Sequence, residues 1–143
     1  SALFHTGRPV VMCPPAKVAP QSLGDHIAIG WNGSQEASRA VAMTLDLVQK
    51  AKTITVLSSG TEPHGATASD LIDYFSLRGV TAELVEFAAG KNAGRALLSQ
   101  CRLMNADMLI IGAYGDSHER ETLFGGNTQA VVDHSEMPVV LVH

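Results

Sequence analysis

Four glycines bracket one short segment of the sequence, GAYGDSHERETLFGGNT: Gly112, Gly115, Gly125 and Gly126. The first ends an apolar run, and the last stands directly before Asn127, where a helical pattern begins. Glycine allows positive φ and close approach of the backbone to a ligand. Backbone N–H groups at a helix N-terminus attract anions, phosphate among them. The spacing therefore favours a phosphate-binding loop over glycines that merely turn the chain.

A second loop of similar character, GWNGS at 30–34, follows another apolar run and also ends where a helix is expected to begin. In parallel sheets with helices on both faces, ligands bind beyond the carboxyl ends of the strands, where the strand order reverses. If the runs before the two loops form neighbouring strands, both loops meet at that point. The sequence then predicts a nucleotide site, on a strand order that the residues alone leave open.

Five apolar runs have the length and composition of strands: HIAIGW (26–31), TITVLS (53–58), TAELVEF (81–87), MLIIG (108–112) and PVVLVH (138–143). TAELVEF alternates apolar and polar residues, which favours an edge strand. MLIIG is continuously apolar, which is typical of a strand covered on both faces. The proline that opens PVVLVH suits the first residue of an edge strand.

Four segments between these runs carry apolar residues at helical spacing. Their apolar faces are Ala37, Ala40, Val41, Thr44, Leu47, Val48 and Ala51; then Ala68, Leu71, Ile72 and Phe75; then Ala93, Leu97, Cys101 and Met104; then Val131 and Val132. Ser34 is the expected N-cap of the first helix, Gly79 ends the second, Asn105 ends the third, and the fourth extends from about Asn127 to His134. Strands that alternate with helices predict an α/β domain, a doubly wound parallel sheet with helices on both faces.

The start and the end of the chain share a pattern, because HTGRPVVMCPP matches HSEMPVVLVH. The first copy is followed by a proline-rich segment at 14–25, PPAKVAPQSLGD, which is typical of a linker. We therefore expect residues 1–13 to be the remnant of a preceding domain, comprising the end of its last helix and its fifth strand. Residues 26–143 would be a second domain of the same kind, and the chain a fragment of a tandem repeat.

The glycine spacing, G-x2-G-x9-G before a last helix and a P-V-x-V strand, resembles that of the universal stress protein family. WNGSQEASRAV is similar to the family's first loop, usually D-G-S followed by acidic and alanine-rich residues. The resemblance covers residues 26–143, and LFHTGRPVVMCPP resembles the end of a preceding domain of that kind. It implies a five-stranded parallel sheet in the order 3-2-1-4-5. It also implies a stress-response or regulatory protein that binds ATP or AMP, with or without Mg²⁺.

The resemblance also assigns residues to the nucleotide. Asn32, followed by Gly33, takes the place of the family's aspartate, which touches the nucleoside. The remaining positions, which hold ribose and phosphates, are Gly112, Ala113, Tyr114, Gly115, Gly125, Gly126, Asn127 and Thr128. Asn32 departs from the family pattern because it keeps hydrogen-bonding groups but carries no charge. Gly126 departs from it because serine or threonine is usual there, so a hydroxyl contact is missing unless a neighbour replaces it.

The family further implies association through fifth strands that pair antiparallel across two domains. A tandem protein can make this pairing within one chain, so residues 9–13 are expected to lie antiparallel against residues 138–142. An uncovered edge strand promotes aggregation, and the remnant strand would cover it. The expected partners are therefore an adenine nucleotide and another universal stress protein domain, in the same chain or in a homodimer.

Composition limits the partners and the cellular location that the sequence predicts. The 143 residues are 45% hydrophobic and 17% charged, with a formal net charge of -4, which argues against nucleic-acid or anionic-membrane partners. No apolar run is long enough to span a bilayer and no signal peptide is recognisable, so a cytoplasmic location is expected. Cys13 and Cys101 are expected to be two buried thiols rather than a disulfide framework.

Catalytic and metal-binding motifs are incomplete in the sequence. HERET at 118–122 resembles a zinc-binding helix but ends in Thr122 rather than histidine, and the six histidines show no metal spacing. The sequence therefore predicts a binding protein with no catalytic residue. Two alternatives stay open: an association module of the same family that binds no nucleotide, and a weak nucleotide hydrolase that would use His118 and Glu119. Trp31 suits equally a packing residue and a wall beside an adenine ring.

Overall fold

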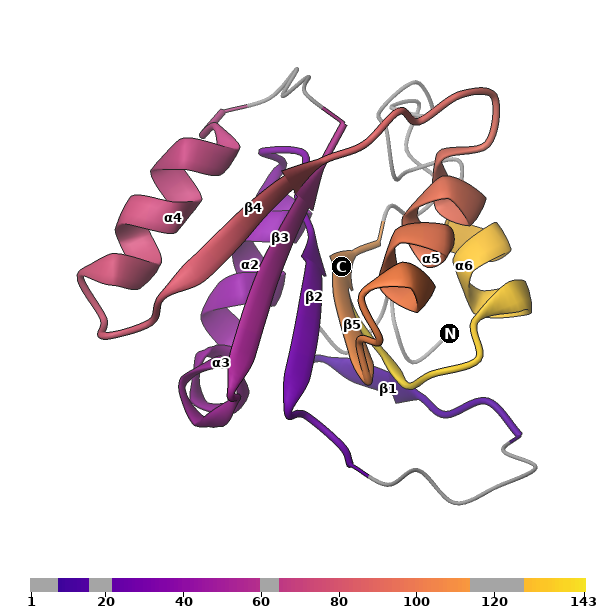
Figure 1. The fold of residues 1–143 in the computed structure, drawn as a ribbon, viewed down its shortest axis with the longest axis horizontal. Coiled ribbons are helices and arrows are strands. Elements are labelled where there is room, and N and C mark those ends of the chain that lie inside the picture. The colour runs from indigo at the N-terminus through magenta and orange to yellow at the C-terminus, as the bar shows by residue number, and fades with distance from the viewer. Residues whose placement is uncertain (1–7, 16–21, 60–64, 114–127) are drawn as a thin grey trace.

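The computed structural model describes residues 8–15, 22–59, 65–113 and 128–143. In these residues a six-stranded sheet separates two layers of helices. Helices α2, α3 and α4 cover one face of the sheet, and helices α5 and α6 cover the other (Figure 1). The α/β class predicted from the alternating strand and helix patterns is confirmed.

Strands and helices alternate along the chain after the first strand. In order, the elements are β1 (Val10–Met12), β2 (His26–Gly30), α2 (Gln35–Met43), α3 (Leu45–Lys50), β3 (Thr53–Ser58), α4 (Ala68–Ser76), β4 (Ala82–Glu86), α5 (Ala93–Leu103), β5 (Met108–Gly112), α6 (Thr128–His134) and β6 (Val139–Val142). The five strands expected in residues 26–143 are β2 to β6, and β1 is the strand expected at residues 9–13.

The order of strands across the sheet is β1-β6-β5-β2-β3-β4. Counted from β2, the five parallel strands follow the expected 3-2-1-4-5 order, and β1 adds a sixth, antiparallel strand beside β6. The sixth strand is the one expected from the first copy of the repeat, and β1 covers the outer edge of β6 as that expectation requires. β4, which is largely exposed, is an edge strand as predicted.

Alternate residues of the strands enter opposite layers of the core, as the period of two in a strand requires. The layer under α2, α3 and α4 contains Ile27, Ile29, Val56, Ile110 and Val140. The layer under α5 and α6 contains Ala28, Leu57, Leu109, Ile111 and Leu141. β5 is buried at every position, which matches the central strand predicted from its continuous apolar run.

The first predicted helix is divided at Thr44. The Thr44 hydroxyl donates a hydrogen bond to the Ala40 carbonyl oxygen at 2.6 Å, and its backbone leaves helical geometry with φ -111° and ψ 10°. A threonine hydroxyl that bonds back to the preceding turn bends a helix. One expected helix therefore becomes α2 and α3, and Leu47, expected on the apolar face, is exposed.

The other predicted helix boundaries agree with the structure. The Ser34 hydroxyl oxygen accepts a hydrogen bond from the Ala37 N–H at 3.1 Å, which makes Ser34 the N-cap of α2. Gly79 has φ 77° beyond the end of α4, and Asn105 has φ 56° beyond the end of α5. Residues with positive φ are the usual terminators of helices.

Strand β1 lies antiparallel against β6, so the pairing expected between the two ends of the chain is confirmed. The paired residues are Val10 with Leu141, Val11 with Val140, and Met12 with Val139. Beyond β1, Cys13 is exposed, which corrects the expectation of two buried thiols; only Cys101, in α5, is buried. Burial raises the pKa of the Cys101 thiol to about 12, so this thiol is unreactive at neutral pH.

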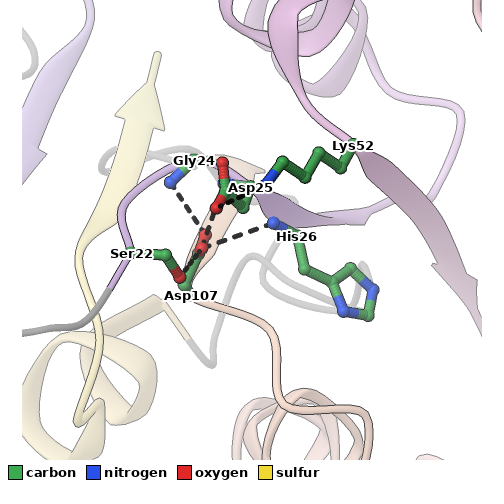
Figure 2. A network of polar contacts seen from close by, with 6 residues as sticks. All are labelled: Ser22, Gly24, Asp25, His26, Lys52 and Asp107. Carbon is green, nitrogen blue, oxygen red and sulfur yellow. Dashed lines mark hydrogen bonds and ion pairs between the residues drawn. The ribbon is translucent and has the colours of Figure 1, made fainter.

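One carboxylate fastens the segment before β2 to the sheet (Figure 2). Asp107, directly before β5, accepts a hydrogen bond from the Ser22 hydroxyl at 2.8 Å. It also accepts bonds from three successive backbone N–H groups: Gly24 at 2.9 Å, Asp25 at 3.0 Å and His26 at 3.3 Å. This network fixes the entry into β2 beside the N-terminal end of β5. It lies at the opposite end of these strands from Gly33 and Gly112.

Candidate functional site

The C-terminal ends of β2 and β5 lie side by side at the centre of the sheet. The chain leaves β2 toward α2 on one face, whereas the helix that follows β5, α6, lies on the other face (Figure 1). This is the reversal of strand order at which α/β sheets bind ligands. Asn32 and Gly33 follow β2, Gly112 ends β5, and Ala113 comes next. The structure therefore brings together the described residues of the two predicted loops.

Gly112 lies directly against the first turn of α2. A Cβ atom on Gly112 would lie 2.5 Å from the carbonyl carbon of Glu36 and closer still to the amide nitrogen of Ala37. Both blocking atoms belong to the backbone, so no side chain can move aside. Packing of α2 on β5 thus requires glycine at this position, whether or not a ligand binds.

Asn32 shapes the loop between β2 and α2. Its side chain is almost fully buried, and its amide oxygen accepts a hydrogen bond from the Ser34 N–H at 3.1 Å. Gly33, between them, has φ 78°. Asparagine commonly forms such turns with the backbone two residues ahead. The family resemblance predicts that Asn32 contacts a nucleoside, and the structure adds this role in the loop.

Gly65 supports the same loop and was missed by the sequence analysis. A Cβ atom on Gly65 would lie 2.8 Å from the Gly33 carbonyl oxygen, and Gly65 has φ 62°. The close approach joins the loop after β2 to the segment before α4. Nothing in the local sequence marks this contact, because the two glycines are distant along the chain.

Trp31 is a packing residue, as one of the two interpretations of the sequence expected. It is 3% exposed and belongs to the core layer under α2, α3 and α4. Its indole N–H donates a hydrogen bond to the Ala66 carbonyl oxygen at 3.1 Å. The ring thus holds the start of the α4 segment against the sheet.

The remaining predicted site residues divide into two groups. Ala113 is fully buried and donates its N–H to the Val142 carbonyl oxygen at 2.8 Å, and Thr128 is the first residue of α6. The others lie outside the described residues, so their roles stay predictions: Tyr114, Gly115, Gly125, Gly126 and Asn127, with His118 and Glu119 of the hydrolase alternative.

The described part of this site is suited to binding rather than proton transfer. Its residues offer backbone groups, an amide and hydroxyls, and none of Asn32, Gly33, Gly112, Ala113 and Thr128 has an ionisable side chain. Within the ranges that the structure describes, no three His, Cys, Asp or Glu side chains gather as they would around a metal ion. In the same ranges, no helix has the length and apolarity needed to cross a membrane.

Comparison with known proteins agrees with this architecture. The model of the universal stress protein family matches residues 24–143. The chain belongs to this family. The match begins just before β2, so it covers the five parallel strands of the universal stress protein domain and leaves β1 outside.

Solved universal stress proteins share the fold at low sequence identity. One from Archaeoglobus fulgidus DSM 4304 superposes with a TM-score of 0.71 and 19% identity, over 94% of this chain and 49% of that one. A member of the family from Burkholderia pseudomallei gives a TM-score of 0.59 and 18% identity, over 86% of this chain and 98% of that one. The present chain thus spans about half the length of the Archaeoglobus protein. No curated protein matches the sequence.

Proposed function

We propose that this universal stress protein domain is a stress-response or regulatory module that binds an adenine nucleotide, ATP or AMP. The proposed site lies beyond the C-terminal ends of the two central strands, β2 and β5. The observation that carries the proposal is the adjacency of these two strands, whose following helices lie on opposite faces of the sheet. This is where doubly wound sheets accept nucleotides.

The chemistry of the described residues fits such a ligand. The loop after β2 leads into the N-terminus of α2, where the helix dipole favours a negative charge. Asn32 and Ser34 supply neutral hydrogen-bonding groups for a nucleoside. The predicted phosphate contacts fall on Gly115 and on the glycine pair before α6. When Mg²⁺ accompanies ATP, it neutralises phosphate charge, and the described site residues themselves provide no carboxylate for it.

Calorimetric titration of the purified chain with Mg-ATP tests this proposal. We expect saturable binding with Kd between about 1 μM and 1 mM, weakened at least about tenfold by Gly115→Leu because the side chain blocks approach of the phosphates. Ala88→Leu, at an exposed position after β4, is the control and should bind as the unaltered chain does. Binding that survives Gly115→Leu would move the nucleotide elsewhere, and an absence of heat from the folded protein would favour the association module.

We infer a second function, association with another domain of this kind, from the register of β1 on β6. The repeat that relates the two ends of the chain aligns Val10 with Val139, Val11 with Val140, and Met12 with Leu141. In the pairing, Val11 lies opposite Val140, its own counterpart, and Val10 lies opposite Leu141, the counterpart of Met12. The pairing is therefore two-fold symmetric about Val11 and Val140, as in an isologous interface between two copies of one strand.

The exposure of the two central valines supports the same proposal. Val140 is 1% exposed beneath the layer of α2, whereas its counterpart Val11 is 55% exposed. A complete preceding domain would place a helix over Val11 as α2 is placed over Val140. On this proposal β1 and residues 1–13 belong to a first domain and residues 14–25 to the linker. The Archaeoglobus structure, about twice as long as the matched region, has room for two such domains.

Release of β1 should therefore convert the chain into a dimer. Met12 packs in the layer under α5 and α6, so Met12→Asp should detach β1 and expose the β6 edge. We expect the unaltered chain to sediment as a monomer and the variant to dimerise at about 10–100 μM, since strand pairing then occurs between copies. Val11→Asp, at the exposed position of the same strand, is the matched control and should stay monomeric.

The symmetry gives this prediction a second readout. In the Met12→Asp chain with Cys13→Ser, a Val140→Cys substitution should form a disulfide between two chains, because residue 140 faces its own copy across the axis. A Met12→Asp chain that is folded but remains monomeric at 100 μM, or that links through other positions, would contradict the proposed interface.

A further inference from the structure

A pocket of about 290 Å3 opens between α2 and α4, beside Trp31 at the start of the loop that follows β2. Its floor is formed by three buried apolar side chains, Trp31, Val41 and Leu71, each less than 5% exposed. This volume is at the lower end of the range for ligand sites, about 300 to 1,000 Å3. The pocket therefore suits a small molecule with an apolar body.

The rim of the pocket is polar, and the charge that it carries is negative. Ser38 of α2 lies on one side, and Asp70 and Tyr74 of α4 lie on the other. Asp70 is exposed, and one of its carboxylate oxygens accepts a hydrogen bond from the Thr67 N–H at 2.9 Å. Among the lining residues there is no cationic side chain, and within the described ranges Asp70 forms no ion pair.

The guanidinium group of the nearby Arg78 stacks on an aromatic ring and does not pair with Asp70. The guanidinium carbon of Arg78 lies 3.6 Å from the centroid of the Tyr74 ring, and Arg78 donates a hydrogen bond to the Tyr74 carbonyl oxygen at 3.1 Å. Attraction between a cation and an aromatic face holds it there. The negative charge at the rim is thus left for a ligand.

We propose that this pocket binds a small organic cation, an ammonium group joined to an apolar or aromatic body. The body packs on Trp31, Val41 and Leu71, and the ammonium group lies beside the Asp70 carboxylate. A nucleotide phosphate does not suit this place, because Asp70 repels it. The pocket adjoins the proposed nucleotide site through Trp31, but none of the residues assigned to the nucleotide lines it.

The probe is 2-phenylethylammonium, and the reporter is Trp31, the single tryptophan of the chain. Titration of the full chain should give a saturable change in tryptophan fluorescence. The neutral analogue 2-phenylethanol should bind at least about fivefold more weakly, the effect of losing one partly exposed charge interaction. Equal binding of the two molecules, or no saturable change with the ammonium up to about 50 mM, would overturn the proposal.

Two substitutions in the pocket and one control outside it test the location of the site without disturbing the core. Asp70→Asn keeps an oxygen for the Thr67 N–H and removes the charge, so affinity for the ammonium should fall about fivefold. Asp73→Asn, on the same helix and outside the pocket, should leave it unchanged. Ala42→Phe, at an exposed position that lines the pocket, should fill it and abolish the fluorescence change. Binding unaffected by both Asp70→Asn and Ala42→Phe would place the cation elsewhere.

Discussion

Replacing Gly112 by alanine is expected to lower the free energy of unfolding by about 3 kcal/mol, because the new methyl group would overlap the backbone of α2. The blocking atoms are the Glu36 carbonyl carbon and the Ala37 amide nitrogen. Relief of the overlap requires α2 to move away from β5, which opens the core layer between them. Urea denaturation followed by circular dichroism measures the loss.

Gly79→Ala is the matched control for this prediction. Gly79 has φ 77°, and nothing lies within 4 Å of the position that a Cβ atom would take. Its replacement should cost about 1 kcal/mol, the penalty for a side chain in the left-handed region without any overlap. A Gly112→Ala variant that loses no more stability than Gly79→Ala would show that α2 does not pack on β5 as closely as described.

Asp107→Ala is expected to cost about 3 kcal/mol, because it leaves four donors without their acceptor. The Ser22 hydroxyl and the N–H groups of Gly24, Asp25 and His26 all bond to this carboxylate (Figure 2). Hydrogen bonds to a charged group are stronger than those between neutral groups. The same variant should speed amide hydrogen exchange at Gly24 and Asp25, since the segment before β2 is no longer fastened to the sheet.

Asp25→Asn separates this effect from the loss of a surface charge. Asp25 pairs with Lys52 at 3.6 Å; the Lys52 side chain is largely exposed and that of Asp25 about half exposed. Such pairs contribute little, so this variant should change stability by less than about 0.5 kcal/mol. If Asp107→Ala and Asp25→Asn were equally mild, the carboxylate of Asp107 would not be the group that holds the segment before β2.

The sequence predicted those parts of the fold that arise from local patterning. The continuous apolar run of β5 indicated a central strand, and its five buried positions confirm it. Ser34 and Gly79 indicated helix boundaries because capping and positive φ are local requirements. The family resemblance supplied the strand order, which periodicity cannot provide, because equally apolar strands can be arranged in several orders.

The features that were missed or mistaken include one local break and several contacts between distant parts of the chain. The Thr44 break was hidden because threonine also fits the apolar face of a continuous helix. Asp107 is one acidic residue beside a strand, and only the folded chain brings four donors to it. The contact of Gly65 with Gly33 likewise joins two loops that the sequence keeps apart. Cys13 was expected to be buried from its residue type, but it follows an edge strand.

The most direct test of the central proposal is to locate the nucleotide by amide chemical shifts in the folded chain. Titration with Mg-ATP, and separately with AMP, should produce saturable shifts at Gly33, Ser34, Gly112 and Ala113. The amides of the Asp107 network, at the N-terminal ends of β2 and β5, should not shift. Shifts confined to the N-terminal ends of these strands or to the pocket between α2 and α4 would contradict a nucleotide site at their C-terminal ends. An absence of shifts at millimolar nucleotide would contradict it as well.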